Sequence, residues 1–142
     1  MKVAVSTTIE RPVAAVWRWY AVDHVRNHPR WDPDMELEPI SEGPIGLGTT
    51  IRRRNRHFGD PIEGEMEIVE WEPERAMGVR IHDANADTHG RVTFEALGPN
   101  ATRLTLEADF PGLDDSKVDQ LRPMIERTAH NIRQLVESDP LG

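Results

Sequence analysis

One short row of polar side chains is the first candidate for ligand chemistry. Arg53, Asn55 and His57 occupy every second position of a strand-like segment, in phase with the apolar Ile51, so the four side chains share one side of a strand. Polar groups that face an apolar interior must be hydrogen-bonded or wet. The pattern therefore predicts the polar end of a ligand cavity. The alternative is that the strand runs past the core here and leaves His57 in solvent.

The histidines are the other groups that could bind a metal ion. His24 and His28 are four residues apart, a spacing that suits two ligands on one helix, but no third ligand is evident. A second polar group surrounds an expected turn and comprises His82, Asp83, Asp87 and His89. No nucleophile elbow, phosphate-binding glycine loop or HExxH motif is present. We therefore expect no metal and no cofactor.

The arginine-rich segment 52–56 is explained by the strand that follows it. A two-residue turn at Gly59–Asp60 places the arginines opposite carboxylates, pairing Arg52 with Glu67, Arg54 with Glu65 and Arg56 with Glu63. The net charge of -8, from 25 acidic and 17 basic residues, also disfavours nucleic acid as a partner.

A second hairpin shows the same division of faces. A loop over 97–101 predicts the pairs His89–Asp109, Arg91–Glu107, Thr93–Thr105 and Glu95–Arg103 on one face. The other face carries Phe94 opposite Leu104 and Val92 opposite Leu106. The sheet should therefore have one charged convex face and one apolar concave face.

The elements that must position these residues follow from hydrophobic periodicity. Strands are expected over 2–10, 35–41, 49–58, 61–71, 76–82, 87–96 and 102–110. Helices are expected over 12–20, over 22–28 and over 114–138. The second helix should end before Pro29, because the residue before a proline disfavours helical geometry. We expect one domain over residues 1–142.

These elements predict an α+β fold of the helix-grip type, with a curved seven-stranded antiparallel sheet wrapped around a long C-terminal helix and two short helices after the first strand. One helix cannot fill the concavity of so wide a sheet, so we expect a cavity. Its apolar walls should be Ile51, Met66, Ile68, Val79, Ile81, Val92, Phe94, Leu106, Met124, Ile125 and Thr128. Its entrance should lie between the N-terminal half of the last helix and the hairpin loops.

Several segments also resemble a known family. They are Ile9–Trp17, Arg30–Asp34, Gly43–Thr49, Val69–Pro73 and Ala101–Thr105. Together they resemble the START-like superfamily, also called SRPBCC, and within it the polyketide cyclase/dehydrase-like proteins. The resemblance runs end to end and implies the helix-grip fold. It leaves function open, because such proteins include lipid carriers and cyclases.

Our first functional hypothesis is that the cavity binds a small hydrophobic ligand, lipid- or polyketide-like. The alternative is a polyketide cyclase/aromatase-type enzyme that uses the same pocket. In that case the resemblance implies that Arg53 holds an enolate oxygen while Asn55 or His57 polarises a carbonyl, although no catalytic residue carries over by motif. A third hypothesis, a co-chaperone-like interaction domain, is disfavoured by the charged convex face.

Composition limits the remaining possibilities. The chain of 142 residues has no cysteine, which excludes disulfides and thiolate metal sites. Its first residues lack the apolar core of a secretory signal, and no apolar run reaches the roughly 18 residues of a membrane span. We therefore expect a cytoplasmic protein without stable membrane association. The sequence leaves the oligomeric state open.

Overall fold

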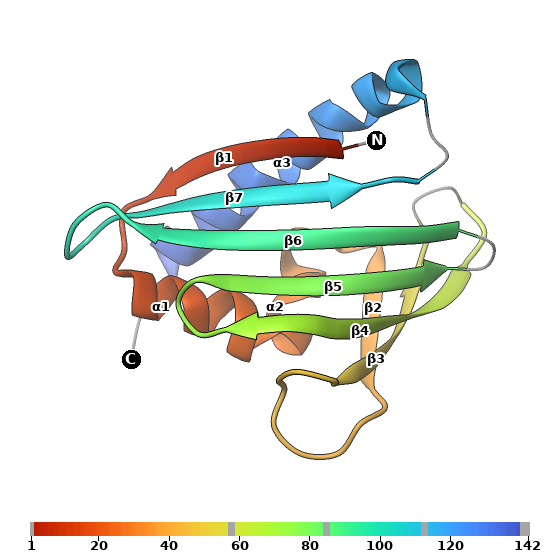
Figure 1. The fold of residues 1–142 in the computed structure, drawn as a ribbon, viewed down its shortest axis with the longest axis horizontal. Coiled ribbons are helices and arrows are strands. Elements are labelled where there is room, and N and C mark those ends of the chain that lie inside the picture. Colours follow the sequence, from red (N-terminus) through yellow and green to blue (C-terminus); the bar gives the residue numbers. More distant parts are fainter. Residues whose placement is uncertain (1, 57–58, 84–85, 112–113, 140–142) are drawn as a thin grey trace.

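Seven antiparallel strands form one sheet in the order β1-β7-β6-β5-β4-β3-β2. The computed structural model describes residues 2–56, 59–83, 86–111 and 114–139. The strands are β1 (Lys2–Ile9), β2 (Met35–Pro39), β3 (Thr50–Asn55), β4 (Ile62–Glu72), β5 (Ala76–Asp83), β6 (Ala86–Ala96) and β7 (Thr102–Asp109). The seven-stranded antiparallel sheet predicted from the sequence is confirmed. Strands that follow each other pair from β2 to β7, and β1 closes against β7 (Figure 1).

The helices lie on one side of this sheet (Figure 1). They are α1 (Val13–Trp17), the π-helical turn η1 (Arg18–Val22), α2 (His24–Trp31) and α3 (Asp115–Ser138). The first predicted helix is therefore divided into α1 and η1. The side chain of Asp114 caps α3 by accepting a hydrogen bond from the backbone N–H of Lys117 at 3.1 Å. In the described ranges, every helix is too short or too polar to cross a membrane.

The core forms where the second half of α3 and the η1 turn meet the concave face of the sheet. Ala129, Ile132 and Val136 of α3 are buried. Between 114 and 128, none of the side chains whose burial is described is buried. Among the α3 side chains whose burial is described, the buried ones therefore all lie in the C-terminal half of the helix.

The prediction that the second helix ends before Pro29 is wrong, because α2 continues to Trp31. The Trp31 ring is buried and stacks on Tyr20, with centroids 5.1 Å apart and 11° between the planes. The buried Asn27 side chain donates a hydrogen bond to the backbone carbonyl of Trp19 at 2.7 Å. These tertiary contacts outweigh the local preference against helix before proline.

Strands β6 and β7 pair in the predicted register. The predicted pairs His89–Asp109, Arg91–Glu107, Thr93–Thr105 and Glu95–Arg103 are all present. Arg103 Nη1 lies 3.2 Å from Glu95 Oε2, while Arg91 Nε bonds Glu70 Oε1 on β4 at 2.8 Å. The prediction of a charged outer face is correct for this part of the sheet.

The predicted register of β3 and β4 is wrong by two residues. Arg52 pairs with Glu65 and Arg54 pairs with Glu63, because β3 ends at Asn55 and β4 begins only at Ile62. The connection is longer than a two-residue turn. The backbone N–H of the next residue, Arg56, bonds the carbonyl of Asp34 at 3.0 Å instead of joining the β4 ladder. A shift of two residues keeps every side chain on its predicted face.

A polar clamp ties the end of α3 to the helical segment η1–α2. Asp139 accepts two hydrogen bonds from the guanidinium of Arg30, at 2.7 and 2.8 Å, and one from Trp19 Nε1 at 2.6 Å. These bonds hold the pKa of Asp139 at about 2, below its usual 3.8. Glu137 adds a bond from the backbone N–H of Glu10 at 2.8 Å. The C-terminal end of α3 is therefore fixed at several points.

Candidate functional site

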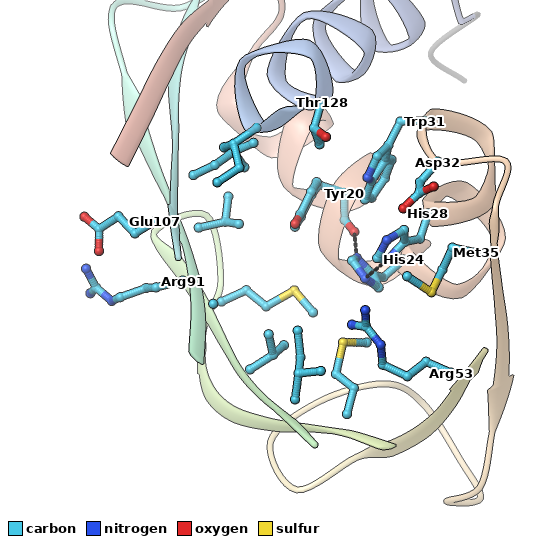
Figure 2. Close-up of a pocket in the computed structure, with 18 residues that line it drawn as sticks. Tyr20, His24, His28, Trp31, Asp32, Met35, Arg53, Arg91, Glu107 and Thr128 are labelled. Atoms are coloured by element: carbon cyan, nitrogen blue, oxygen red, sulfur yellow. Dashed lines mark hydrogen bonds between the residues drawn. The ribbon is translucent and has the colours of Figure 1, made fainter. Parts of the chain in front are cut away.

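A cavity of about 220 Å³ lies between the concave face of the sheet, the η1–α2 segment and α3 (Figure 2). Its apolar wall consists of Met35, Met66, Met77, Val79, Ile81, Gly90, Val92, Leu106 and Ile125. Its polar lining consists of Tyr20, His24, His28, Asp32, Arg53 and Thr128. Arg91 and Glu107 also border it, but Figure 2 shows their side chains pointing away from the cavity. Most of the surface is thus apolar, with polar groups concentrated beside η1–α2.

Gly90 helps to leave this space open. It lies on β6 in phase with Val92, so any side chain at this position would face the cavity. It pairs with Val79 on one side and Ala108 on the other. A Cβ atom at position 90 would lie 3.1 Å from the Val79 methyl group Cγ2. A larger residue at position 90 would therefore narrow the cavity.

Arg53 is a buried cation in the lining of the cavity. The residue is only 8% exposed, and Figure 2 shows its guanidinium directed toward His24. Its Nε lies 3.1 Å from Asp83 Oδ1, within ion-pair distance but without hydrogen-bond geometry. Burial lowers the pKa of Arg53, and the carboxylates of Asp83 and Asp32 oppose this shift. The guanidinium remains protonated, as arginine does in proteins.

Gly64 allows Arg53 and Asp83 to approach each other. The three residues form one row across β3, β4 and β5, because Gly64 pairs with Arg53 on one side and with Asp83 on the other. A Cβ atom on Gly64 would lie 2.1 Å from Asp83 Oδ1 and 2.3 Å from the backbone oxygen of His82. The space of a missing side chain is therefore occupied by the Asp83 carboxylate.

His24 and His28 form a hydrogen-bonded chain on the opposite wall. His24 Nδ1 lies 2.9 Å from the backbone oxygen of Tyr20, and His28 Nδ1 lies 3.0 Å from His24 Nε2. Burial lowers the pKa of His24 to about 4, and the Arg53 charge adds to this shift despite the bond to Tyr20. His24 is thus neutral at pH 7, with its proton on Nδ1 because a carbonyl can only accept. His24 Nε2 must then accept from His28 Nδ1–H.

Aromatic rings complete this side of the cavity. Trp31 stacks between Tyr20 and His28, at centroid distances of 5.1 and 4.7 Å. Burial raises the pKa of Tyr20, so its phenol stays neutral, and Figure 2 shows its hydroxyl directed into the cavity. The wall therefore offers flat apolar surface together with neutral hydrogen-bonding groups.

A second cleft of about 380 Å³ adjoins the cavity between α3 and the turn after α2. Both spaces are bordered by Trp31, Asp32, Ile125 and Thr128. From α3 the cleft is lined by Met124, Ile125, Arg127, Thr128 and Asn131, around the middle of the helix. The entrance expected near the hairpin loops stays a prediction.

The sequence pattern of the family described as polyketide cyclase/dehydrase and lipid transport matches residues 1–137. The chain belongs to this family. A search of curated protein sequences finds no match.

Solved structures share the fold of this family member. A START superfamily protein from Mycobacterium smegmatis has a TM-score of 0.79 at 14% identity, covering 96% of this chain and 97% of that one. BexL, a di-domain ARO/CYC from the BE-7585A biosynthetic pathway, has a TM-score of 0.77 at 17% identity, and the match covers 99% of this chain and 48% of BexL. DynU16, from the dynemicin biosynthetic locus, has a TM-score of 0.74 at 23% identity, and the match covers 96% of this chain and 47% of DynU16. The chain spans about half the length of the last two, and these identities support the fold alone.

Eight of the thirteen residues predicted to bind the ligand border the cavity of this family member. They are Arg53, Met66, Val79, Ile81, Val92, Leu106, Ile125 and Thr128. Asn55, Ile68 and Phe94 are buried but do not line it, as is also true of the predicted wall residue Ile51. Met124 is 42% exposed and borders only the adjoining cleft. His57 lies outside the described residues. A role in ligand binding stays a prediction for all of them.

The sequence interpretation missed the wall that η1 and α2 contribute to the site of this family member. Tyr20, His24, His28 and Trp31 all border the cavity. The four-residue spacing of the histidines was the available signal, but it was interpreted only as metal-ligand spacing. Among the described residues, no group of three or more His, Cys, Asp or Glu side chains is placed to hold a metal ion. The two histidines instead hydrogen-bond each other.

Proposed function

We propose that this protein binds a small, largely apolar molecule in the cavity between the sheet and α3. The observation that carries the proposal is an apolar space of about 220 Å³ with one buried guanidinium, Arg53, at its polar end. Ligand sites of proteins characteristically combine apolar walls with a few polar groups that fix the orientation of the ligand. Membership of a cyclase and lipid-transport family supports the same function.

The size of the cavity favours ring compounds over long chains. A protein cavity of roughly 150 Å³ accepts benzene, and drug-sized ligands occupy about 300–1,000 Å³. The value of about 220 Å³ therefore suits one or two fused rings. A longer lipid- or polyketide-like ligand would extend past Trp31 and Thr128 into the adjoining cleft.

Native mass spectrometry of the purified protein tests this proposal. We expect a stoichiometric complex that releases a small apolar compound on denaturing extraction. Thr128→Phe places a ring against the cavity and should abolish the complex. Glu126→Phe, an exposed position two residues away that borders neither space, should retain it. A protein that is empty and also fails to bind single-ring and fused-ring aromatic compounds, fatty acids, sterols and aromatic polyketides would contradict the proposal.

A polyketide cyclase/aromatase activity is the second candidate, and the histidine pair favours it. His24 and His28 place two imidazoles on the cavity wall, of which that of His24 is neutral at pH 7, with Arg53 beside them. An imidazole can exchange a proton with a bound ligand, and a guanidinium can stabilise a developing oxyanion. Turnover of the extracted compound, lost in His28→Gln without loss of binding, would establish this activity. Binding without turnover would leave only the carrier function.

A further inference from the structure

The charges around Arg53 are not arranged as in a simple anion site. Asp83 Oδ1 lies 3.1 Å from Arg53 Nε, and Asp32 borders the same cavity. Both carboxylates act electrostatically on the guanidinium, in the direction that stabilises its charge. His24 adds no charge at pH 7. Among the described residues at this end, one guanidinium thus lies near two carboxylates.

The Asp83 carboxylate is held in this position by the sheet. Because Gly64 separates Arg53 from Asp83 and has no side chain, the carboxylate occupies the space above it. The Asp83 side chain is only 20% exposed, so solvent screens its interaction with Arg53 weakly. A ligand would therefore meet a guanidinium whose charge is already neutralised.

We infer that the cavity selects uncharged ring compounds bearing a carbonyl oxygen, and that Asp83 excludes the corresponding acids by neutralising Arg53. A carbonyl can accept a hydrogen bond from the guanidinium without bringing charge into the cavity. A carboxylate would be a third anion beside one cation, and it would lose its hydration as well. This inference rests on the proposed function and names its ligand class.

Pairs of probes with nearly the same shape test the selection. Acetophenone and benzoate, like 2-acetylnaphthalene and 2-naphthoate, differ by a methyl group in place of a charged oxygen. We expect calorimetric titration at pH 7.5 to give at least tenfold tighter binding of each ketone than of its acid. An acid that binds as tightly as its ketone would overturn the inference while leaving cavity binding intact. If none of the four probes binds, the inferred ligand class is wrong. If, in addition, no compound of the wider panel binds and no complex is found by native mass spectrometry, the proposed function is wrong as well.

Asp83→Asn distinguishes this mechanism from the general free-energy cost of moving a charged ligand from water into an apolar cavity. The change keeps the shape but leaves Arg53 with excess positive charge, so the ketone-to-acid affinity ratio should fall at least tenfold. Asp87→Asn, on the same hairpin but with a 61% exposed side chain, should leave the ratio unchanged. An unchanged ratio in Asp83→Asn would overturn the inference.

Asp32→Asn provides a second variant that does not disturb the close Arg53–Asp83 contact. It removes the other carboxylate from the cavity wall, so the ratio should fall in the same direction by a smaller factor. A ratio that rises or stays constant in Asp32→Asn would count against the charge argument, even if Asp83→Asn failed to fold.

Discussion

The Gly64→Ala substitution tests whether the missing side chain at position 64 allows Asp83 to approach Arg53 across β4. The added Cβ atom would lie 2.1 Å from Asp83 Oδ1, 2.3 Å from the backbone oxygen of His82 and 2.7 Å from the Asp83 Cα atom. The carboxylate can rotate away, but the two backbone atoms cannot. Strands β4 and β5 must therefore move apart at this end, where Gly64–Asp83 is the last pair of their ladder.

The expected loss of stability combines three effects. Overpacking costs about 1–3 kcal/mol, and weakening the contact of the buried Arg53 with Asp83 costs about 1–3 kcal/mol more. Replacing glycine restricts the unfolded chain and returns about 0.4–1 kcal/mol. We therefore expect Gly64→Ala to lower the free energy of unfolding by about 1–5.5 kcal/mol, a large part of the roughly 5–15 kcal/mol of a typical domain.

Urea unfolding followed by tryptophan fluorescence measures this loss. Gly46→Ala is the matched control, because a Cβ atom there meets nothing within 4 Å and the residue has no positive φ. We expect the control to stay within about 0.5 kcal/mol of the unmodified protein. If Gly64→Ala unfolds at the same urea concentration as Gly46→Ala, the close approach of Asp83 to Gly64 is wrong, and so is the account of the ion pair.

Three further predictions concern charged and titrating groups. Arg53→Met should weaken binding of a carbonyl ligand by about 1.5–3 kcal/mol in calorimetry. It should also lower the free energy of unfolding by about 3–5 kcal/mol. A variant as stable as the unmodified protein would exclude a structural ion pair. The pKa of Asp139 is depressed from 3.8 to about 2, so the stability that this carboxylate contributes above pH 3.8 should fall by about 1–2 kcal/mol toward pH 2. Urea titrations at several pH values should show this loss in the unmodified protein and not in Asp139→Asn. Because the pKa of His24 is depressed from 6.5 to about 4, stability should decline by about 2–3 kcal/mol from pH 6.5 to pH 4, and an imidazole NMR signal that titrates near pH 6.5 would contradict this.

The structure changes what Arg53→Met is expected to do. Arg53 taken alone would be a ligand anchor whose loss leaves the fold intact. Its position beside the buried Asp83 makes it part of a structural pair as well. The double variant Arg53→Met/Asp83→Asn should therefore recover much of the stability that the single variant loses, without recovering ligand affinity.

Charge patterns predicted the faces of the sheet better than they predicted its register. Arginines at 52, 54 and 56 and glutamates at 63, 65 and 67 repeat every two residues. A shift of two residues therefore gives opposite-charge pairs again, with Arg52 opposite Glu65 instead of Glu67. The inward orientation of Arg53 was predictable, since it depends only on alternation. The β6–β7 register was predictable because the observed loop has the expected length.

The wall formed by η1 and α2 could not be read from local patterns. Tyr20 reaches the cavity from a π-helical turn, and Trp31 reaches it because the helix continues through Pro29. Both features depend on rings that pack against each other from different elements, such as Tyr20 on Phe94 of β6 at a centroid distance of 6.0 Å. Local propensity carries no information about such contacts. The exposure of Met124 was missed for the same reason, since periodicity does not reveal which half of a long helix is lifted from the sheet.

The unequal attachment of α3 bears on how fast a ligand can exchange. Its C-terminal half is fixed by the buried Ile132 and Val136 and by the Asp139 clamp, whereas Ile125 and Thr128, which border both the cavity and the adjoining cleft, are not fully buried. Local fluctuations of a protein can have free energies far smaller than that of unfolding, and weakly buried segments such as this one are where they are expected. We therefore expect the residence time of the proposed ligand and the lifetime of the folded state to be separate quantities, so that mutations at Ile125 and Thr128 alter the first more than the second.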